Sequence, residues 1–221
     1  MGFARSALHA NPLTLDASLA CANAELDGAN ATAIVAWALE RAANPVLSTN
    51  FRPGAAALIH LVTRARPDIP VIWIDTGYNT PATYRHVETL VARWKLNLHC
   101  YTPRVTPARR AAIDGGIPHA DDADFMRFTR DAKLEPFERA FNELKPDVWF
   151  TGVRAEHSSF RRELGVVSRG THNTLRVAPT FHWSSRDIAA YLALQGIEDN
   201  DDYADPTKPD AHRECGLQLL S

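Results

Sequence analysis

Short, unbroken apolar runs constrain the fold of this chain more than any other feature. Residues 71–74 (Val-Ile-Trp-Ile) and 148–150 (Val-Trp-Phe) are two such runs, rich in β-branched and aromatic residues. A strand that is apolar on both sides is covered on both faces, which is typical of a parallel sheet. Between the runs, apolar residues recur at helical spacing, as in residues 81–94. The alternation predicts βαβ units and a doubly wound, mostly parallel α/β sheet, with strands near residues 46–48, 71–74, 97–101 and 148–151.

The length of 221 residues allows one domain or two small ones. We expect residues 1–198 to form a single α/β domain. Residues 199–221 are predicted to be a mobile C-terminal tail, because the stretch from 199 to 210 is acidic, contains prolines and lacks periodicity.

Charge and hydropathy exclude several classes of partner. The chain has 24 basic and 26 acidic residues, a net charge of −2, so it offers no basic field for nucleic acid. No apolar run approaches the roughly 18 residues that a membrane span needs. The N-terminus also lacks the apolar core of a signal peptide. We therefore expect a cytoplasmic protein in which any anion site is local.

Three loops that directly follow predicted strands are the candidate ligand sites, because ligands bind at the carboxyl ends of the strands in such sheets. Hydroxyls and amides in the first loop suit a phosphate or sulfate, although a plain turn with a capping hydroxyl explains that loop more simply when it is taken alone. The acid of the second loop either accepts hydrogen bonds from a ligand or caps a tight turn, and its glycine permits close approach of the ligand. The residues of interest are Ser48 and Thr49, then Asp75, Thr76 and Gly77, and finally Gly152.

Arginine residues gather after the fourth predicted strand. A guanidinium group can bind a phosphate or sulfate with two donors. A solvated helix face is the commoner role of arginine and remains the alternative. The group comprises Arg154, Arg161, Arg162 and Arg169, with His157 and Ser158 among them. None of the nine histidines belongs to a recognisable zinc pattern, so no metal site is predicted.

Cys215 lies in a different setting from the other two cysteines. Cys21 and Cys100 lie beside apolar stripes and are expected in the core. Cys215 has no apolar periodicity around it, and its neighbours His212 and Arg213 favour a thiolate. An incidental tail cysteine is the alternative. Three cysteines suit a reducing compartment and are too few for a four-cysteine iron–sulfur cluster.

Five ordered motifs resemble the sulfonucleotide reductases, specifically the phosphoadenylyl-sulfate (PAPS) reductases of sulfate assimilation. The densest match is residues 56–101, which include RPDIPVIWIDTGYNTPATYR and the LNL strand. Residues 133–136 (Lys-Leu-Glu-Pro) resemble the family's K-V-x-P element. Residues 152–161 resemble its G-L-R-x-x-Q-S-x-x-R segment, and residues 213–217 (Arg-Glu-Cys-Gly-Leu) are similar to its C-terminal ECGLH.

The resemblance implies an adenine nucleotide alpha hydrolase-like (PP-loop-like) fold with a catalytic Cys215 on a flexible tail. It implies that the Cys215 thiolate attacks the sulfur of PAPS, that adenosine 3′,5′-bisphosphate leaves, and that thioredoxin or glutaredoxin releases sulfite from the S-sulfocysteine. The substrate-binding residues implied by the matched motifs are Ser48, Thr49, Asp75, Thr76, Gly77, Lys133, Gly152, Arg154, Arg161 and Arg213.

Four departures from the family pattern affect the choice between a PAPS reductase and the alternative functions. Phe128-Thr129 stands where related adenylyl-sulfate (APS) reductases carry a cysteine pair, so no iron–sulfur cluster is expected and PAPS is favoured. Arg52-Pro53 stands where glycine is usual after phenylalanine, Gln218 replaces a histidine, and the tail before Arg213 is short. The alternatives are a cluster-free APS reductase and a nucleotide-binding sensor or partner without reductase activity. Cys215 favours the enzyme, the short tail favours the sensor, and a homodimer is left open.

Overall fold

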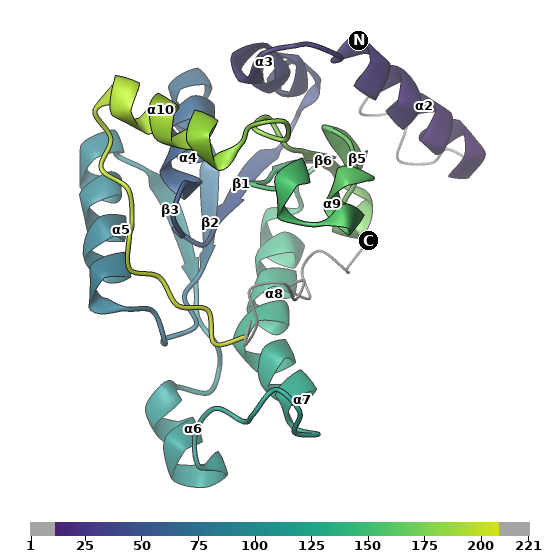
Figure 1. Ribbon diagram of the computed structural model, residues 1–221. Helices are drawn as coiled ribbons and strands as arrows, with labels where there is room; N and C mark the ends of the chain where they lie inside the picture. The colour runs from purple at the N-terminus through teal and green to yellow at the C-terminus, as the bar shows by residue number, and fades with distance from the viewer. Residues whose placement is uncertain (1–11, 208–221) are drawn as a thin grey trace.

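The computed structural model describes residues 12–207, which form a six-stranded sheet between two layers of helices (Figure 1). The strands follow the order β3-β2-β1-β4-β6-β5, and all neighbouring pairs are parallel except β5 and β6. Their bounds are β1 Pro45–Thr49, β2 Pro70–Ile74, β3 Asn97–Tyr101, β4 Val148–Phe150, β5 Val167–Arg169 and β6 Leu175–Val177. The predicted α/β fold with a mostly parallel sheet is confirmed, and β5 and β6 are strands that the sequence did not predict.

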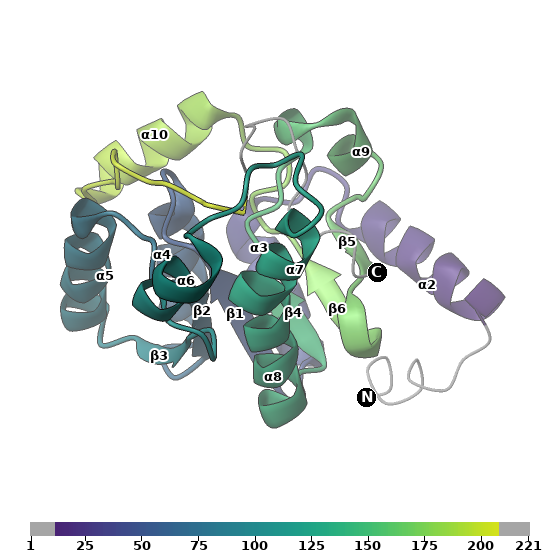
Figure 2. The ribbon, with the colours of Figure 1, turned by 90° about the horizontal axis from the view of Figure 1, so that it is seen from below.

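Helices cover both faces of the sheet (Figure 2). Buried residues of α3, α4, α5 and α10 form the larger core on one face, and α8 packs on the other face. The α-helices are α2 Pro12–Glu25, α3 Ala31–Arg41, α4 Ala55–Ala65, α5 Pro81–Trp94, α6 Pro107–Asp114, α7 Phe125–Thr129, α8 Glu135–Leu144, α9 Ser159–Arg162 and α10 Ser185–Gln195. A π-helical turn, η1 (Arg130–Leu134), joins α7 to α8, and short 3-10 turns lie at Ala155–His157 and Thr171–Asn173. None of the helices in this part of the chain combines the length and the apolar character needed to cross a membrane.

The apolar runs are unbroken because the central strands contribute side chains to two hydrophobic cores, one on each face of the sheet. Successive side chains of a strand point to opposite faces. Val46 therefore enters the core under α8, while its neighbour Leu47 enters the larger core. Trp149 and Phe150 divide in the same way on β4. A strand buried on both sides has no position for a polar residue until it ends, so polar residues are concentrated at the strand ends.

The cysteines in the described residues do not lie in the core, and the prediction that they do is wrong. Cys21 and Cys100 are both exposed. Cys21 lies on the outer side of α2, next to the buried Ala22. Cys100 lies on β3, which is an edge strand, and the buried position at its end is Tyr101. Leu98 packs against the larger core and Tyr101 lies in the core under α8, so both sides of β3 are partly covered, yet Cys100 is exposed although it alternates with Leu98.

The outer edge of the sheet at β5 is covered by α2. The Asn23 side chain donates to the Val167 carbonyl at 2.7 Å and accepts from the Val167 amide at 3.0 Å. Gly165, with a φ of 72°, allows this approach, because a Cβ at that position would lie 2.7 Å from the Asn23 Oδ1. A side-chain amide thus occupies the hydrogen-bonding position that a further strand would take.

Residues 199–207 follow α10 and are hydrogen-bonded to the domain. Asp199 accepts from the Gly54 amide at 2.8 and 2.9 Å, which places a carboxylate at the N-terminus of α4. The buried Asn200 donates to the Phe51 carbonyl at 2.8 Å. The Asp202 carbonyl accepts from the Thr80 hydroxyl at 2.6 Å. The expected tail of residues 199–221 therefore begins with a bonded segment, which composition alone did not predict.

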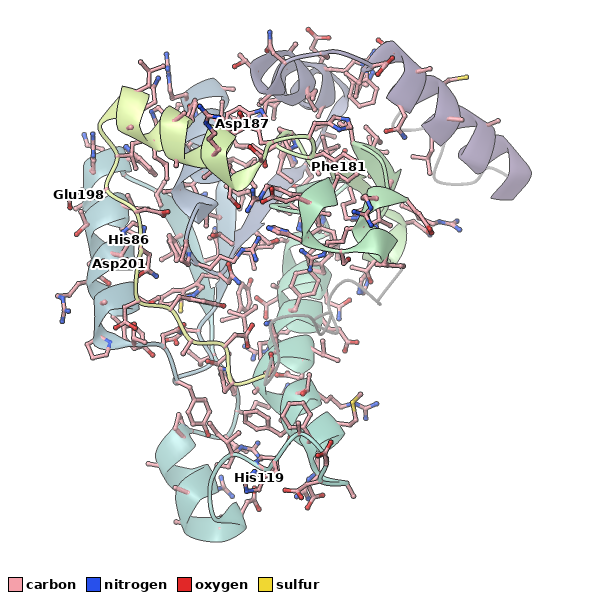
Figure 3. The ribbon with its side chains drawn as sticks, viewed as in Figure 1. His86, His119, Phe181, Asp187, Glu198 and Asp201 are labelled. Atoms are coloured by element: carbon pink, nitrogen blue, oxygen red, sulfur yellow. The ribbon has the colours of Figure 1, made fainter. Side chains whose placement is uncertain are left out.

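The position of this segment along α5 is visible from its acidic side chains. Glu198 and Asp201 lie beside His86 of α5 (Figure 3). Burial lowers the pKa of His86, and the charges of Asp199 and Glu198 oppose that shift. Residues 208–221 lie outside the described residues, so the placement of Arg213 and Cys215 and the mobility of the tail stay predictions.

Candidate functional site

A pocket opens at the carboxyl ends of β1 and β4, where the direction of strand addition reverses. Such reversal points are the usual ligand sites of open α/β sheets. The pocket has a volume of about 180 Å³. Of the site residues predicted from sequence, those that line it are Ser48, Thr49, Thr76, Lys133, Gly152, Arg154 and Arg161. Asp75 and Gly77 are not among its lining residues.

The β1–α4 loop forms one wall of the pocket. The Ser48 hydroxyl accepts a hydrogen bond from the Trp149 indole at 2.8 Å. Phe51 adopts a left-handed φ of 52°, which is unusual for a bulky residue. Its fully buried ring is fixed edge-on against Trp73, with 5.5 Å between the ring centroids. Burial of this ring outweighs the backbone strain and turns the following residue, Arg52, toward the pocket.

Some hydrogen-bond donors of this loop are already used. The Gly54 amide, at the N-terminus of α4, binds the Asp199 carboxylate at 2.8 and 2.9 Å. A carboxylate at this position is favoured by the helix dipole. An anionic ligand in the pocket therefore relies on side-chain cations more than on the free amides that the sequence suggested.

Asp75 organises the turn after β2. Its Oδ1 accepts from the Gly77 amide, from Asn79 Nδ2 and from the Tyr84 hydroxyl, at 2.8 to 2.9 Å. Burial, together with the hydrogen bond to Asp75, raises the pKa of Tyr84 to about 12. Gly77 has a φ of 80°, and a Cβ there would lie 2.7 Å from the Pro107 ring. The close approach at Gly77 is therefore to α6, and a ligand role for Asp75 stays a prediction.

Three arginines line the same end of the pocket, and we call Arg52, Arg154 and Arg161 the guanidinium group. Arg154 and Arg161 are buried, so neither belongs to a solvated helix face. Arg154 donates to Glu156 at 2.5 Å. Burial lowers the pKa of Arg154, and Glu156 opposes that shift.

Two members of the guanidinium group contact one imidazole ring. Arg161 Nη1 lies 2.9 Å from His157 Nδ1, and Arg52 Nη2 lies 3.2 Å from His157 Nε2. Burial, followed by the charges of Arg52, Arg154 and Arg161, lowers the pKa of His157 to about 3. The ring is therefore neutral at pH 7, and it has one nitrogen that can accept a hydrogen bond. It can accept through that nitrogen only, so Arg52, which lies 3.2 to 3.3 Å from both ring nitrogens, and Arg161, 2.9 Å from Nδ1, do not each have an accepting nitrogen of their own.

Lys133 provides the cation at the other end of the pocket. It lies on the π-helical turn η1, a type of turn that is frequent at functional sites. Its buried ammonium forms an ion pair with Asp205 and donates to the Thr207 hydroxyl at 3.2 Å. Burial alone would raise the pKa of Asp205, but the charge and hydrogen bond of Lys133 outweigh burial and hold that pKa below its usual value.

Apolar side chains complete the pocket between its two cationic ends. Ile72, Ile74, Phe137 and Trp149 line it on the α8 side of the sheet. A pocket with an apolar wall and convergent cations suits a ligand with a flat ring and anionic groups. Within residues 12–207 no set of three His, Cys, Asp or Glu side chains is arranged to hold a metal ion.

Sequence reasoning did not assign several residues that line the pocket. Arg52 could have been singled out from the sequence, because it stands after Phe51 where the family pattern usually has glycine. Asp205 gave no local signal, since its partner Lys133 lies 72 residues away. The other unassigned polar lining residues are Asn50, Asn79, Thr151, Thr180 and Tyr203.

An apolar slot with cations at the reversal point of a doubly wound sheet places the chain among the nucleotide-binding α/β proteins. The family model described as "Phosphoadenosine phosphosulfate reductase domain" matches residues 44–205. The chain belongs to this family of oxidoreductases, and the family and enzyme class predicted from sequence are confirmed.

Two curated relatives illustrate the similarity. Phosphoadenosine 5′-phosphosulfate reductase of Synechococcus sp. is 40% identical over 182 residues, which is 81% of this chain and 78% of the relative. The protein of the same name from Cronobacter sakazakii is 39% identical over 198 residues, covering 86% of this chain and 80% of the relative.

Solved structures share the fold at lower identity. The crystal structure of a PAPS reductase from Candida auris, a phosphate complex, aligns with a TM-score of 0.71 at 22% identity, over 83% of this chain and 88% of that chain. FMN adenylyltransferase of Candida glabrata aligns with a TM-score of 0.51 at 16% identity, over 72% of this chain and 49% of that chain. These likenesses support the PP-loop-type fold.

Proposed function

We propose that the chain reduces PAPS to sulfite and adenosine 3′,5′-bisphosphate, with thioredoxin or glutaredoxin as the electron donor and Cys215 as the nucleophile. The observation that carries this proposal is the convergence of Lys133, Arg154 and Arg161 on one pocket at the strand ends. These three residues come from two separate family-like motifs, and the nucleotide carries anionic groups that need several cations. The apolar wall suits the adenine ring.

The chemistry balances without a resident cofactor. The Cys215 thiolate attacks the sulfur of PAPS, an S–S bond forms, and the bond from sulfur to the phosphate oxygen breaks. Adenosine 3′,5′-bisphosphate leaves with the electron pair of that bond. A thioredoxin thiolate then attacks the Cys215 sulfur and expels sulfite. The second thioredoxin thiol resolves the mixed disulfide, which restores the Cys215 thiol and leaves thioredoxin oxidised by two electrons.

The position of the last described residue supports delivery of Cys215 to the pocket. Thr207 contacts Lys133, which lines the pocket. Eight further residues of extended chain span at most about 28 Å. Cys215 is therefore within reach of any point in the pocket. We propose that residues 1–198 act as the nucleotide-binding domain and residues 199–221 as the tail that carries Cys215, which must visit first the nucleotide and then the reductant.

Sulfite release tests the proposal. PAPS and APS are each supplied with reduced thioredoxin, and we expect sulfite from PAPS. Cys215→Ser should abolish release, whereas Cys21→Ser and Cys100→Ser serve as matched controls and should retain it. Burial raises the pKa of the Cys100 thiol, which makes it a poorer nucleophile despite its exposure.

The covalent intermediate gives a second measurement. Without thioredoxin, the peptide that contains Cys215 should gain the mass of one sulfonate after incubation with PAPS. PAPS binding without this adduct would favour a nucleotide sensor, and release from APS alone would favour the cluster-free APS reductase. Full activity of Cys215→Ser would eliminate the mechanism.

A further inference from the structure

One buried hydroxyl in the wall of the pocket has no hydrogen-bond partner among the described residues. Thr151 directly follows β4, lines the pocket and is only 3% exposed. Its Oγ1 makes no hydrogen bond within residues 12–207. Several buried side-chain nitrogen and oxygen atoms in this part of the chain lack a partner, and the Thr151 hydroxyl is the one that belongs to a pocket-lining residue. One unmet hydrogen bond therefore lies at the candidate site.

Thr151 lies on the side of the sheet that carries the apolar wall of the pocket. Its amide donates to the Val177 carbonyl at 2.9 Å, so sheet pairing continues one residue beyond β4. Side chains alternate along a strand, and Trp149, two residues earlier, packs in the core under α8. The Thr151 side chain therefore falls on the same side as the Trp149 ring, which lines the pocket. The Trp149 indole donates to Ser48 at 2.8 Å, so this polar group of the wall is already used.

A buried hydroxyl without a partner lowers the stability of a folded protein. It has left water, and no hydrogen bond compensates for that loss. A valine at position 151 would have nearly the same shape and would pack without this penalty. A polar group that is kept at a cost to stability is typical of a binding site.

The flat ring that suits the apolar wall needs a partner of the same kind. An adenine ring carries nitrogen atoms along its edge, and burial of the ring removes water from them. A hydroxyl can both donate and accept, so it suits either a ring nitrogen or the amino group of the ring. A hydrogen bond between Thr151 and this edge would satisfy both groups at once.

We propose that the Thr151 hydroxyl binds the edge of the adenine ring and is retained for binding at the expense of stability. The inference rests on the proposed function and deepens it, because it takes an adenine nucleotide as the ligand. Removal of the hydroxyl should raise stability and lower affinity, a pair of opposite effects that a purely structural residue does not give.

Thr151→Val tests this, because it removes the hydroxyl and keeps the branched side chain. We expect the urea midpoint of the ligand-free protein to rise. The affinity for adenosine 3′,5′-bisphosphate, measured by calorimetry, should fall about three- to tenfold, the range for one neutral hydrogen bond. Thr151→Ser keeps a hydroxyl and should stay within about twofold of the original affinity.

Thr129→Val is the matched control. Thr129 is also buried and has no side-chain partner in the described part of the chain, but it does not line the pocket. Its replacement should raise the urea midpoint and leave the affinity for adenosine 3′,5′-bisphosphate unchanged.

Adenosine separates the base from the phosphates. Thr151→Val should weaken adenosine binding, measured by NMR titration, by the same factor as bisphosphate binding. An unchanged affinity for adenosine or for the bisphosphate would overturn the contact with the base while nucleotide binding stands. A lower urea midpoint for Thr151→Val would make the hydroxyl a structural group and would also overturn the inference. If the original protein does not bind the bisphosphate, the proposed function fails first.

Discussion

The two cationic ends of the pocket balance their charge in opposite ways. Lys133 is buried and faces a buried acid, Asp205, from the segment that follows α10. The guanidinium group gathers around neutral His157, and Arg154 pairs with Glu156, whose side chain is about one-third exposed. The Lys133 ammonium is therefore paired with an acid that the chain itself buries, whereas the acid that pairs with Arg154 is open to solvent.

Because of this difference, substitutions at the two places should affect different properties, the stability of the fold in one case and ligand affinity in the other. A buried ion pair contributes little as a pair, but the loss of one partner leaves the other charge buried without compensation. Glu156, the partner of Arg154, is partly exposed, so water can compensate its charge when Arg154 is replaced. Substitutions at the Lys133 end should therefore act mainly on folding, and substitutions at the guanidinium end mainly on ligand affinity.

The largest expected effect is on stability, in Lys133→Ala. The Asp205 carboxylate would stay buried without its cation, which costs roughly 3–5 kcal/mol. Urea unfolding of the ligand-free protein measures this change. The double variant Lys133→Met/Asp205→Asn should recover most of the loss, because it removes both charges. A loss below about 1 kcal/mol for Lys133→Ala would mean that Asp205 finds water when Lys133 is absent.

Arg154→Ala should act on binding. A charged hydrogen bond contributes roughly 1.5–3 kcal/mol, so the affinity for adenosine 3′,5′-bisphosphate should fall about ten- to a hundredfold. Arg162→Ala is the matched control, since Arg162 is exposed on α9 and should leave the affinity unchanged. An unchanged dissociation constant for Arg154→Ala, measured by calorimetry, would remove Arg154 from the ligand site.

The pH dependence of folding should distinguish the two ends. The pKa of His157 is about 3 in the folded protein against an ordinary value of 6.5, so the unfolded chain binds the proton first as the pH falls. Stability is therefore lost below about pH 6.5, by roughly 2 kcal/mol at pH 5. His157→Asn should remove this part of the profile, as measured by urea unfolding between pH 7 and pH 5.

Asp205 affects stability at lower pH than His157 does. Its pKa in the folded state lies below the ordinary value of 3.8, so its contribution to stability is fully present above pH 3.8 and is lost as the pH falls through the folded pKa. Asp205→Asn should leave the profile between pH 7 and pH 5 unchanged. A change there would contradict the assignment of that window to His157.

The smallest effect is expected for Glu156→Gln. Glu156 pairs with Arg154 and accepts from the Ser185 hydroxyl at 2.6 Å, but its exposure to solvent weakens the pair. Stability should fall by about 0.5–1 kcal/mol. The affinity for adenosine 3′,5′-bisphosphate should rise two- to threefold, roughly the effect of 0.5 kcal/mol, because a negative charge leaves the guanidinium end. Weaker binding would show that Glu156 orients Arg154.

Sequence reasoning predicted the central strands because burial on both faces leaves an unbroken apolar run, as in β2 and β4. It missed β5 (Val-Ser-Arg) and β6 (Leu-Arg-Val), since neither is an unbroken apolar run and β6 includes the buried Arg176. The predicted burial of Cys100 was wrong because the larger core covers Leu96 and Leu98 on this edge strand but does not extend to Cys100. The ends of central strands can be predicted from the sequence, whereas the burial of residues on an edge strand depends on which elements pack against it.

The residues of the candidate site that lie at strand ends could be predicted from the sequence, but their long-range contacts could not. Ser48 lies near the end of β1, Gly152 and Arg154 come shortly after β4, and the sheet brings all three to one pocket. The contacts of Arg52 with His157 and of Lys133 with Asp205 join residues 105 and 72 positions apart. Such pairs depend on the path of the chain over the sheet, which leaves no local pattern in the sequence.

The amide of Asn23 gives the two borders of the sheet different capacities for self-association. An incoming strand would have to displace Asn23 from both main-chain groups of Val167 before it could add at β5. The opposite border, β3, ends the sheet with no described strand beyond it. Unprotected strand borders are templates for intermolecular pairing. If this protein polymerises under stress, growth should therefore begin at β3, and solubility should depend more on the polar side chains of Asn97 and His99 than on any residue of β5.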